Sequence, residues 1–390
     1  MTRPGRWWPL LAHAALTHAA YAAVRPMVGY RAVELDGGTA AIGALSASFS
    51  ILPLVLALPV GRQVDRFGAP RLVAAGGVLF AAACAAAVFA AGVGTLLVPI
   101  ALLGLGQLAV LVGQQAMAAT IRPGNRDQAF GTLTSVAAGG QILGPLLATA
   151  AASRGPVSGW TAANLGTAVA AVLALGAVPL SRWLLSGGGP RPDPGVRPPP
   201  VHRAAGALVR IPGMWPALAA GGVVLAALDL LQVFLPVWAQ DRGVSPTAVG
   251  ALLALRAGAT LLARLLAARM VRRIGRRAGM VGSILAAGAG LALVPLVDPA
   301  GAVAVMVVLG VGLGMAQPLS MGWVVELAAP GTQGSALGLR LSANRLAQTV
   351  VPLGVGVAAA GPSAVFWSTS LLLGGASVAL LRAPPGTSEP

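Results

Sequence analysis

The sequence predicts an all-α integral membrane protein with twelve transmembrane helices in two six-helix bundles. Of its 390 residues, 56% are hydrophobic and only 9% are charged, whereas roughly 25% of the residues of a soluble domain are charged. Apolar stretches of about 20 residues, the length that crosses a bilayer as a helix, recur along the whole chain. The second half also repeats residues of the first half at a constant spacing. These three observations exclude a soluble globular fold.

Twelve apolar stretches are predicted to cross the membrane. They cover residues 9–33, 40–60, 70–92, 95–121, 128–152, 160–184, 213–238, 246–268, 278–297, 300–326, 335–360 and 363–382. The segment between the sixth and seventh stretches is too rich in Gly and Pro for a helix and too polar for lipid, which predicts a linker. We therefore expect an N-terminal six-helix bundle at residues 1–185, a cytoplasmic linker at 186–207 and a C-terminal six-helix bundle at 208–390.

Arginines account for the strong positive charge. The chain has no lysine, and its 26 basic residues against 10 acidic residues give a formal net charge of +16. With the N-terminus inside, most arginines fall in inner loops, and the outer loops receive only Arg31, Arg154 and Arg242. This asymmetry follows the positive-inside rule. It predicts a bacterial inner-membrane protein with both termini in the cytoplasm, and it explains the charge without nucleic acid.

The two halves of the chain are sequence repeats. Residues in several helices and loops match at an offset of 207 positions: Gly43 with Gly250, Arg62 with Arg269, Arg66 with Arg273, Gly68 with Gly275, Gln141 with Gln348, and Pro145 with Pro352. Each repeat holds an even number of spans, so the bundles have the same orientation and are related by a pseudo-twofold axis along the membrane normal. We expect a solute site between them.

The loop after the second span carries a recognisable motif. It reads Gly61, then Asp65, Arg66 and Gly68, followed by Arg71. This pattern resembles the cytoplasmic loop signature of the major facilitator superfamily, and the twelve-span, two-repeat layout extends the resemblance over the whole chain. The resemblance implies a transporter in which this loop latches the bundles together on the cytoplasmic side. Asp65 is expected to cap the next helix; a basic turn that only sets topology is the alternative.

Glycines at regular spacing mark the fifth span. Gly131, Gly140, Gly144 and Pro145 resemble the signature of drug and proton antiporters within that superfamily, although the paired glycines that end the signature are absent. Small residues allow helices to approach closely, and a proline kinks a helix. The resemblance favours export, and close helix packing without a transport role is the alternative.

Charged side chains inside a span are costly and usually functional. Asp229 is the only carboxylate deep within a predicted span, and Arg25 and Arg256 are deep arginines within reach of it. An acid in an apolar site can carry a proton, whereas a neighbouring arginine favours the charged carboxylate. We expect Asp229 and Arg25 to belong to a proton-coupling or substrate site, or else to form a structural tie between the bundles. Two deep arginines against one aspartate favour a neutral or anionic substrate.

Polar residues beside these charges extend the candidate cavity. His18 and Tyr21 share one face of the first helix with Arg25, and Gln232 stands on the same face of the seventh helix as Asp229. The two helices are repeat equivalents, so their polar faces are expected to meet between the bundles.

The sequence offers no centre for enzymatic chemistry. Its single cysteine and its histidines are scattered and form no set of metal ligands or catalytic groups. A phosphate loop is excluded because the chain has no lysine. A membrane enzyme such as a lipid transferase would need such a centre, so we expect no enzymatic activity, no cofactor and no metal.

The predicted function is secondary active transport. The leading hypothesis is proton-coupled efflux of a small neutral or anionic drug-like molecule or metabolite, and a solute importer or uniporter of the same fold is the alternative. The expected partners are a small-molecule substrate, protons and the lipid bilayer, with no nucleic acid. The protein is expected to act as a monomer.

Overall fold

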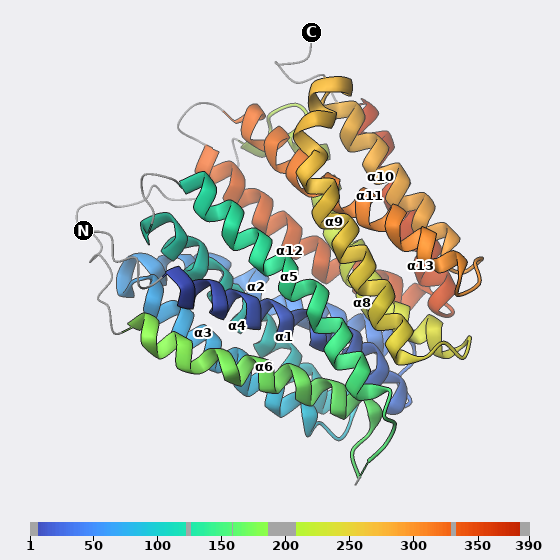
Figure 1. Ribbon diagram of the computed structural model, residues 1–390. Helices are drawn as coiled ribbons and strands as arrows, with labels where there is room; N and C mark the ends of the chain where they lie inside the picture. Colours follow the sequence, from blue (N-terminus) through green and yellow to red (C-terminus); the bar gives the residue numbers. More distant parts are fainter. Residues whose placement is uncertain (1–6, 122–125, 158, 186–207, 329–332, 383–390) are drawn as a thin grey trace.

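The computed structural model describes residues 7–121, 126–157, 159–185, 208–328 and 333–382. Within these ranges the chain forms twelve long helices (Figure 1). They are α1 Trp7–Glu34, α2 Thr39–Phe67, α3 Ala69–Val88, α4 Val93–Ile121, α5 Arg126–Ala152, α6 Ala162–Leu185, α8 Met214–Gln240, α9 Pro246–Ile274, α10 Arg276–Leu293, α11 Gly301–Leu327, α12 Gln333–Ala358 and α13 Pro362–Arg382. Each overlaps one predicted span. The predicted linker at 186–207 lies outside the described residues.

The helices form two bundles with the same internal packing. Figure 1 shows α1 to α6, coloured blue to green, as one group and α8 to α13, coloured yellow to red, as the other. In the first bundle α1 packs on α5 and α6, α2 on α4, and α3 on α4 and α6. In the second bundle α8 packs on α12 and α13, α9 on α11, and α10 on α11 and α13. The predicted all-α fold of two related bundles is confirmed.

Matching turns confirm the repeat at the level of the backbone. α2 and α9 each contain 29 residues, and both of their ends differ by the offset found in the sequence. The glycines that follow them, Gly68 and Gly275, have φ values of 86° and 81°, a conformation that only glycine adopts at little cost. Each glycine donates its N–H to the carbonyl four residues earlier, and the next helix starts at once.

The surface of the helices suits a membrane. Nine of the twelve helices in the described part of the chain are long and apolar enough to cross a bilayer by length and composition alone. Large apolar side chains such as Val55, Leu265 and Leu371 are exposed on the outward faces, where lipid would cover them. The three helices that fall short are α1, α10 and α12. Two of these, α1 and α12, carry buried arginines and face the centre of the molecule.

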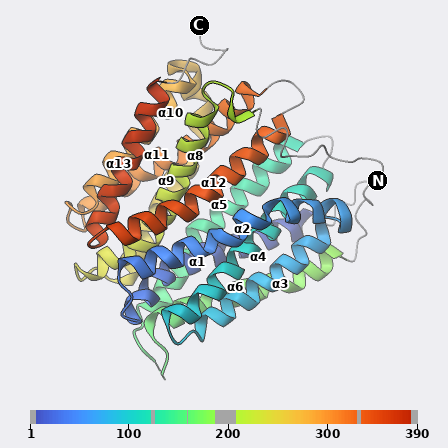
Figure 2. The same cartoon turned by 180° about the vertical axis from the view of Figure 1, so that it is seen from behind.

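The bundles meet along three pairs of helices. α1 packs on α8, α2 on α12, and α5 on α9; Figure 1 shows α5 beside α9, and Figure 2 shows α2 beside α12. We call the end of the molecule at which α1 ends and α2 begins the distal end, and the opposite end the proximal end. α5, α8 and α12 also end at the distal end, because successive helices run in opposite directions.

Glycines bring the bundles together at the distal end. A Cβ atom on Gly43 of α2 would lie 2.5 Å from the Pro352 carbonyl oxygen of α12, and one on Gly250 of α9 would lie 3.0 Å from the Pro145 carbonyl oxygen of α5. These two contacts are repeat equivalents of each other. A side chain on Gly29 of α1 would also collide with the α8 backbone. The described conformation is therefore closely packed between the bundles at its distal end.

Candidate functional site

A buried ion pair joins the two bundles at the centre of the molecule. Nη2 of Arg25 on α1 lies 3.1 Å from Oδ1 of Asp229 on α8, and the two side chains are 1% and 2% exposed. Of the two partners that the sequence allowed for Asp229, the structure brings Arg25 to the carboxylate. Two charges removed from water need further polar contacts to offset their lost hydration.

The other carboxylate oxygen of Asp229 is also occupied. Gln348 on α12 donates from Nε2 to Oδ2 of Asp229 at 2.7 Å. Arg345, one turn earlier on the same helix, donates from Nη1 to Oε1 of Gln348 at 3.2 Å. The Gln348 amide therefore orients the carboxylate and places a second guanidinium near it. This network connects α1, α8 and α12.

An aromatic ring supports the guanidinium of Arg25. The guanidinium carbon lies 4.9 Å from the centre of the Phe49 ring on α2, and the Tyr21 ring packs against the same Phe49 with ring centres 5.5 Å apart. No nitrogen of the Arg25 guanidinium makes a hydrogen bond of normal geometry to a described residue. Arg25 is therefore held by the charge of Asp229 and by the face of the Phe49 ring.

A small cavity lies beside this network, between the bundles. Helices α1, α5, α8 and α9 line it with Tyr21, Ala22, Gln141, Pro145, Gln232, Leu253 and Arg256. Arg256 is only 5% exposed, and within the described residues no ion pair joins it to a carboxylate. Its Nε and the Oε1 of Gln232 are buried without a hydrogen-bond partner in that part of the chain. The cavity thus holds an unused donor and an unused acceptor.

The predicted cavity residues divide into three groups. Tyr21, Gln232 and Arg256 line the cavity, whereas Arg25 and Asp229 form the ion pair next to it. His18 belongs to neither group. It is 7% exposed, and its Cβ lies against the backbone of α5 at the position of a glycine.

The sequence reasoning placed four residues of this centre outside the candidate site. Gln141 and Gln348 were visible as a matched pair in the repeat, but nothing in the sequence said what each faces. Arg345 lies within the predicted span 335–360, and nothing in its spacing identifies a partner for it. Phe49 lies in an apolar stretch that gives no sign of a role beyond packing.

The latch motif lies at the proximal end. Gly61 is within α2, and Gly68 forms the turn into α3. Arg66 and Arg71 are exposed, and the guanidinium of Arg66 lies 5.0 Å from the ring centre of the adjoining Phe67. The side chain at position 65 is outside the described residues, so the capping and latch role of Asp65 stays a prediction.

The glycine motif of α5 packs that helix on α1. A Cβ on Gly140 would lie 2.5 Å from the carbonyl oxygen of Ala15, and one on Gly144 would also collide with the α1 backbone, whereas Gly131 faces open space. The carbonyl of Pro145 meets α9 of the other bundle, and Pro145 also lines the cavity. The motif therefore joins close packing within one bundle to a contact between the two.

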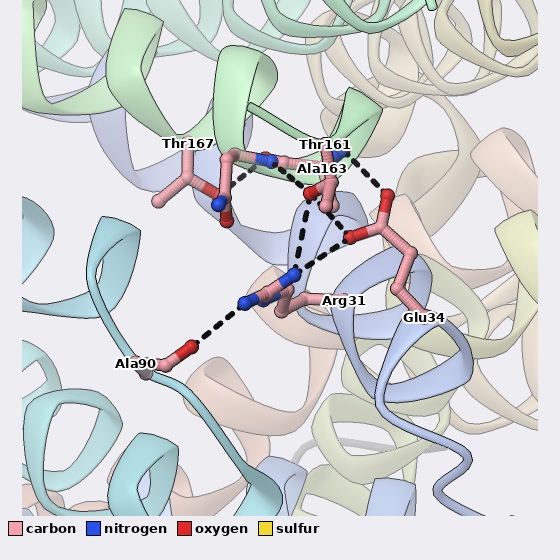
Figure 3. Close-up of polar contacts among 7 residues, drawn as sticks. Arg31, Glu34, Ala90, Thr161, Ala163 and Thr167 are labelled. Carbon is pink, nitrogen blue, oxygen red and sulfur yellow. Dashed lines mark hydrogen bonds and ion pairs between the residues drawn. The ribbon is translucent and has the colours of Figure 1, made fainter. Parts of the chain in front are cut away.

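A second ionic cluster fixes the distal end of the first bundle (Figure 3). Arg31 and Glu34, at the end of α1, form an ion pair of 3.1 Å. Thr161 and the backbone N–H of Ala163 donate to the Glu34 carboxylate at 2.6 and 3.0 Å, and Arg31 donates to the Ala90 carbonyl at 2.8 Å. These contacts tie α1 to α6 and to the loop between α3 and α4.

A third polar cluster lies inside the first bundle. Gln114 donates from Nε2 to Nδ1 of His13 at 2.9 Å and to Oγ1 of Thr17 at 3.1 Å. On the other side of the ring, Nε2 of His13 lies 2.9 Å from Oγ of Ser181. Both ring nitrogens have partners, and no group of three possible metal ligands occurs among the residues that the structure describes.

A family model covers almost the whole chain. The model of the Major Facilitator Superfamily matches residues 10–242 and 217–390. None of the curated proteins matches the chain.

Three solved structures illustrate the fold similarity. A mutant of the nucleoside transporter NupG gives a TM-score of 0.80 at 17% identity, over 96% of this chain and 98% of that one. A mutant of the peptide transporter POT gives 0.75 at 18% identity, over 97% and 93%. A bacterial homolog of the human lysosomal transporter Spinster, in an inward-facing and occupied conformation, gives 0.75 at 13% identity, over 97% and 96%.

Proposed function

Because the chain belongs to the major facilitator superfamily, we propose that it is a proton-coupled secondary transporter that exports a small neutral or anionic molecule by alternating access. It would act as a monomer in a bacterial inner membrane, with the proximal end and both termini in the cytoplasm. The observation that carries the proposal is the Arg25–Asp229 ion pair, in which a buried guanidinium of one bundle meets a buried carboxylate of the other.

Alternating access requires the two bundles to move against each other around the cavity. The distal contacts at Gly43 and Gly250 would have to open, and the proximal latch around Asp65 would have to close. The pair at the centre links α1 to α8, so a change in the distance between the bundles also changes the distance between Arg25 and Asp229. This geometry supports a role for the pair in the transport cycle.

Proton coupling follows from the chemistry of a buried acid. While Arg25 and Gln348 face Asp229, they stabilise the charged carboxylate. When movement of the bundles withdraws Arg25, an apolar site favours the neutral acid, and Asp229 takes up a proton. A cycle that makes and breaks the pair would thus load the proton on one side of the membrane and release it on the other.

Two further observations bear on direction and substrate. The glycine motif of α5 is similar to that of drug and proton antiporters, which favours export. Three buried or nearly buried arginines, Arg25, Arg256 and Arg345, lie in or beside the centre with the single carboxylate of Asp229, which disfavours a cationic substrate. NupG and POT are named as nucleoside and peptide transporters, and small polar solutes of that size are reasonable first compounds to assay.

The test is solute flux in proteoliposomes that contain a trapped pH indicator. A panel of neutral and anionic solutes is added with and without an imposed pH gradient, and a transported solute should collapse the gradient. The Asp229→Asn variant should lose pH-driven accumulation and keep part of the downhill exchange, because an amide keeps the size of the acid but cannot carry a proton. Asp241→Asn, at an exposed position of the distal end, is the matched control.

Three results would change the proposal. Unchanged pH-driven transport by monodisperse Asp229→Asn protein would eliminate this residue as the proton carrier. Solute movement without proton movement in the unmodified protein would indicate a uniporter. Accumulation in the direction of the cytoplasm would indicate an importer.

A further inference from the structure

We infer that the cavity between the bundles binds a carboxylate of the transported molecule, with Arg256 as its cationic ligand. The inference rests on the proposed transport function for its biological meaning. Binding at this cavity can nevertheless be measured without a gradient, and so independently of proton coupling.

Arg256 is a buried cation without a counterion among the described residues. Its side chain is 5% exposed, and its Nε faces no acceptor in that part of the chain. Asp229 does not serve it: no ion pair joins the two residues, and the carboxylate of Asp229 faces Arg25 at 3.1 Å and Gln348 at 2.7 Å instead. An unpaired charge at this depth is costly. A carboxylate presents two oxygens that match the planar fork of a guanidinium, so a bound ligand would offset this cost.

The internal repeat identifies where that carboxylate would lie. At the repeat offset, Asp229 corresponds to Ala22, Arg25 to Gln232, and Gln348 to Gln141. Asp229, Arg25 and Gln348 belong to the ion-pair network. Their equivalents, Ala22, Gln232 and Gln141, line the cavity. The cavity is thus the repeat counterpart of the Asp229 site. Where that site has the carboxylate of Asp229, the cavity has the methyl group of Ala22.

The remaining lining residues supply the other groups of an anion site. The cavity has an accessible volume of about 10 Å³, room for one water at most, so a carboxylate would enter it when the bundles separate. In the network, a glutamine amide donates to the carboxylate of Asp229, and Gln141 is the repeat equivalent of that glutamine. Arg256 on α9 occupies the position equivalent to Phe49 on α2. The cation of the cavity therefore comes from α9, whereas the cation of the ion-pair network, Arg25, comes from α1, the repeat equivalent of α8. Tyr21 adds a hydroxyl, and Leu253 and Pro145 give apolar walls.

The experiment measures ligand-induced stabilisation of the purified full-length protein. Acetate, lactate, benzoate and phenylacetate are each compared with their uncharged amides in thermal unfolding, and inorganic phosphate is included. At least one carboxylate should raise the melting temperature in a saturable manner while its amide does not. Arg256→Gln should weaken that binding at least tenfold. Arg272→Gln, which removes an exposed charge from the last turn of α9 outside the cavity lining, should leave the affinity unchanged.

A second variant supplies the missing acid from the protein itself. Ala22→Asp places a carboxylate at the position equivalent to Asp229, so it should abolish carboxylate binding and raise the melting temperature of the ligand-free protein. Asp229→Asn should keep carboxylate binding, so unchanged pH-driven flux in this variant with intact binding would refute the role of Asp229 in proton coupling and leave the anion site standing. The inference is overturned if no carboxylate stabilises the protein, if amides or only phosphate stabilise it, or if binding survives Arg256→Gln.

Discussion

The two halves of the chain use repeat-related residues in the same way at the distal end and in different ways at the centre. At the distal end, Gly43 meets the Pro352 carbonyl and Gly250 meets the Pro145 carbonyl. Each contact brings a helix of one bundle against a helix of the other. At both contacts a Cβ atom would crowd the carbonyl of the facing proline, so the shared close approach accounts for a glycine at this position in both halves.

At the centre the same offset joins residues of different chemistry. The pairs are Ala22 with Asp229, Arg25 with Gln232, Phe49 with Arg256, and Gln141 with Gln348. Only one member of the first pair is an acid, so only one of the two equivalent places forms an ion pair. The comparison teaches that helix packing constrains both repeats alike, whereas the charges between them can diverge and create an asymmetric site.

The largest expected effect comes from breaking the ion pair. Arg25→Met leaves Asp229 buried with no ion-pair partner and with the Gln348 amide as its remaining hydrogen-bond donor. Loss of one partner of a buried pair costs about 3 to 5 kcal/mol. Thermal unfolding in detergent should show a correspondingly large drop in melting temperature. The double variant Arg25→Met with Asp229→Leu should recover most of it, because no unpaired charge remains. Equal stability of the single variant and the unmodified protein would contradict a pair that stabilises the fold.

The two glutamines of the centre offer a sharper comparison. Gln348 donates to a carboxylate, and a hydrogen bond to a charged group contributes about 1.5 to 3 kcal/mol. Gln141 lines the cavity, and none of the described residues that line it is an acid. We expect Gln348→Leu to destabilise the ligand-free protein by that amount and Gln141→Leu to change its unfolding free energy by less than about 0.5 kcal/mol. Equal losses of unfolding free energy in the two variants would mean that the two glutamines have equivalent surroundings in the ligand-free protein.

The sequence predicted more of the fold than of the centre, for a physical reason. Span length, arginine distribution and the repeat depend on composition and spacing, and these are readable from the letters. Gly68 and Gly275 matched in the sequence, and they form matching turns in the structure. The partner of a side chain depends on the rotation and tilt of its helix, which periodicity does not specify. Asp229 therefore had two possible partners until the structure brought Arg25 to it.

The distal glycines test the symmetric part of the comparison. Gly43→Ala introduces a methyl group against the Pro352 carbonyl, and Gly250→Ala introduces one against the Thr149 side chain and the Pro145 carbonyl. Such overpacking costs about 1 to 3 kcal/mol. Both variants should loosen the distal end to a similar extent. A cysteine introduced at Thr39, which donates to the Ala359 carbonyl across the bundles, should then react faster with an impermeant maleimide. Gly258→Ala faces open space on α9 and serves as the control.

The smallest effect concerns Phe49, the residue that Arg256 replaces in the second half. The ring lies under the guanidinium of Arg25 at 4.9 Å, and a cation–π contact contributes from about 0.5 kcal/mol at exposed sites to about 2 kcal/mol where both groups are desolvated, as here. Phe49→Leu alone would mix this contact with lost packing, so the variant is also made in the Arg25→Met background. Packing lost at the ring is the same in both backgrounds, and the difference between them isolates the cation–π contribution. Thermal or denaturant unfolding of the four proteins should give a coupling free energy within that range. A coupling of zero would mean that Phe49 only fills space and that Asp229 alone holds Arg25 in place.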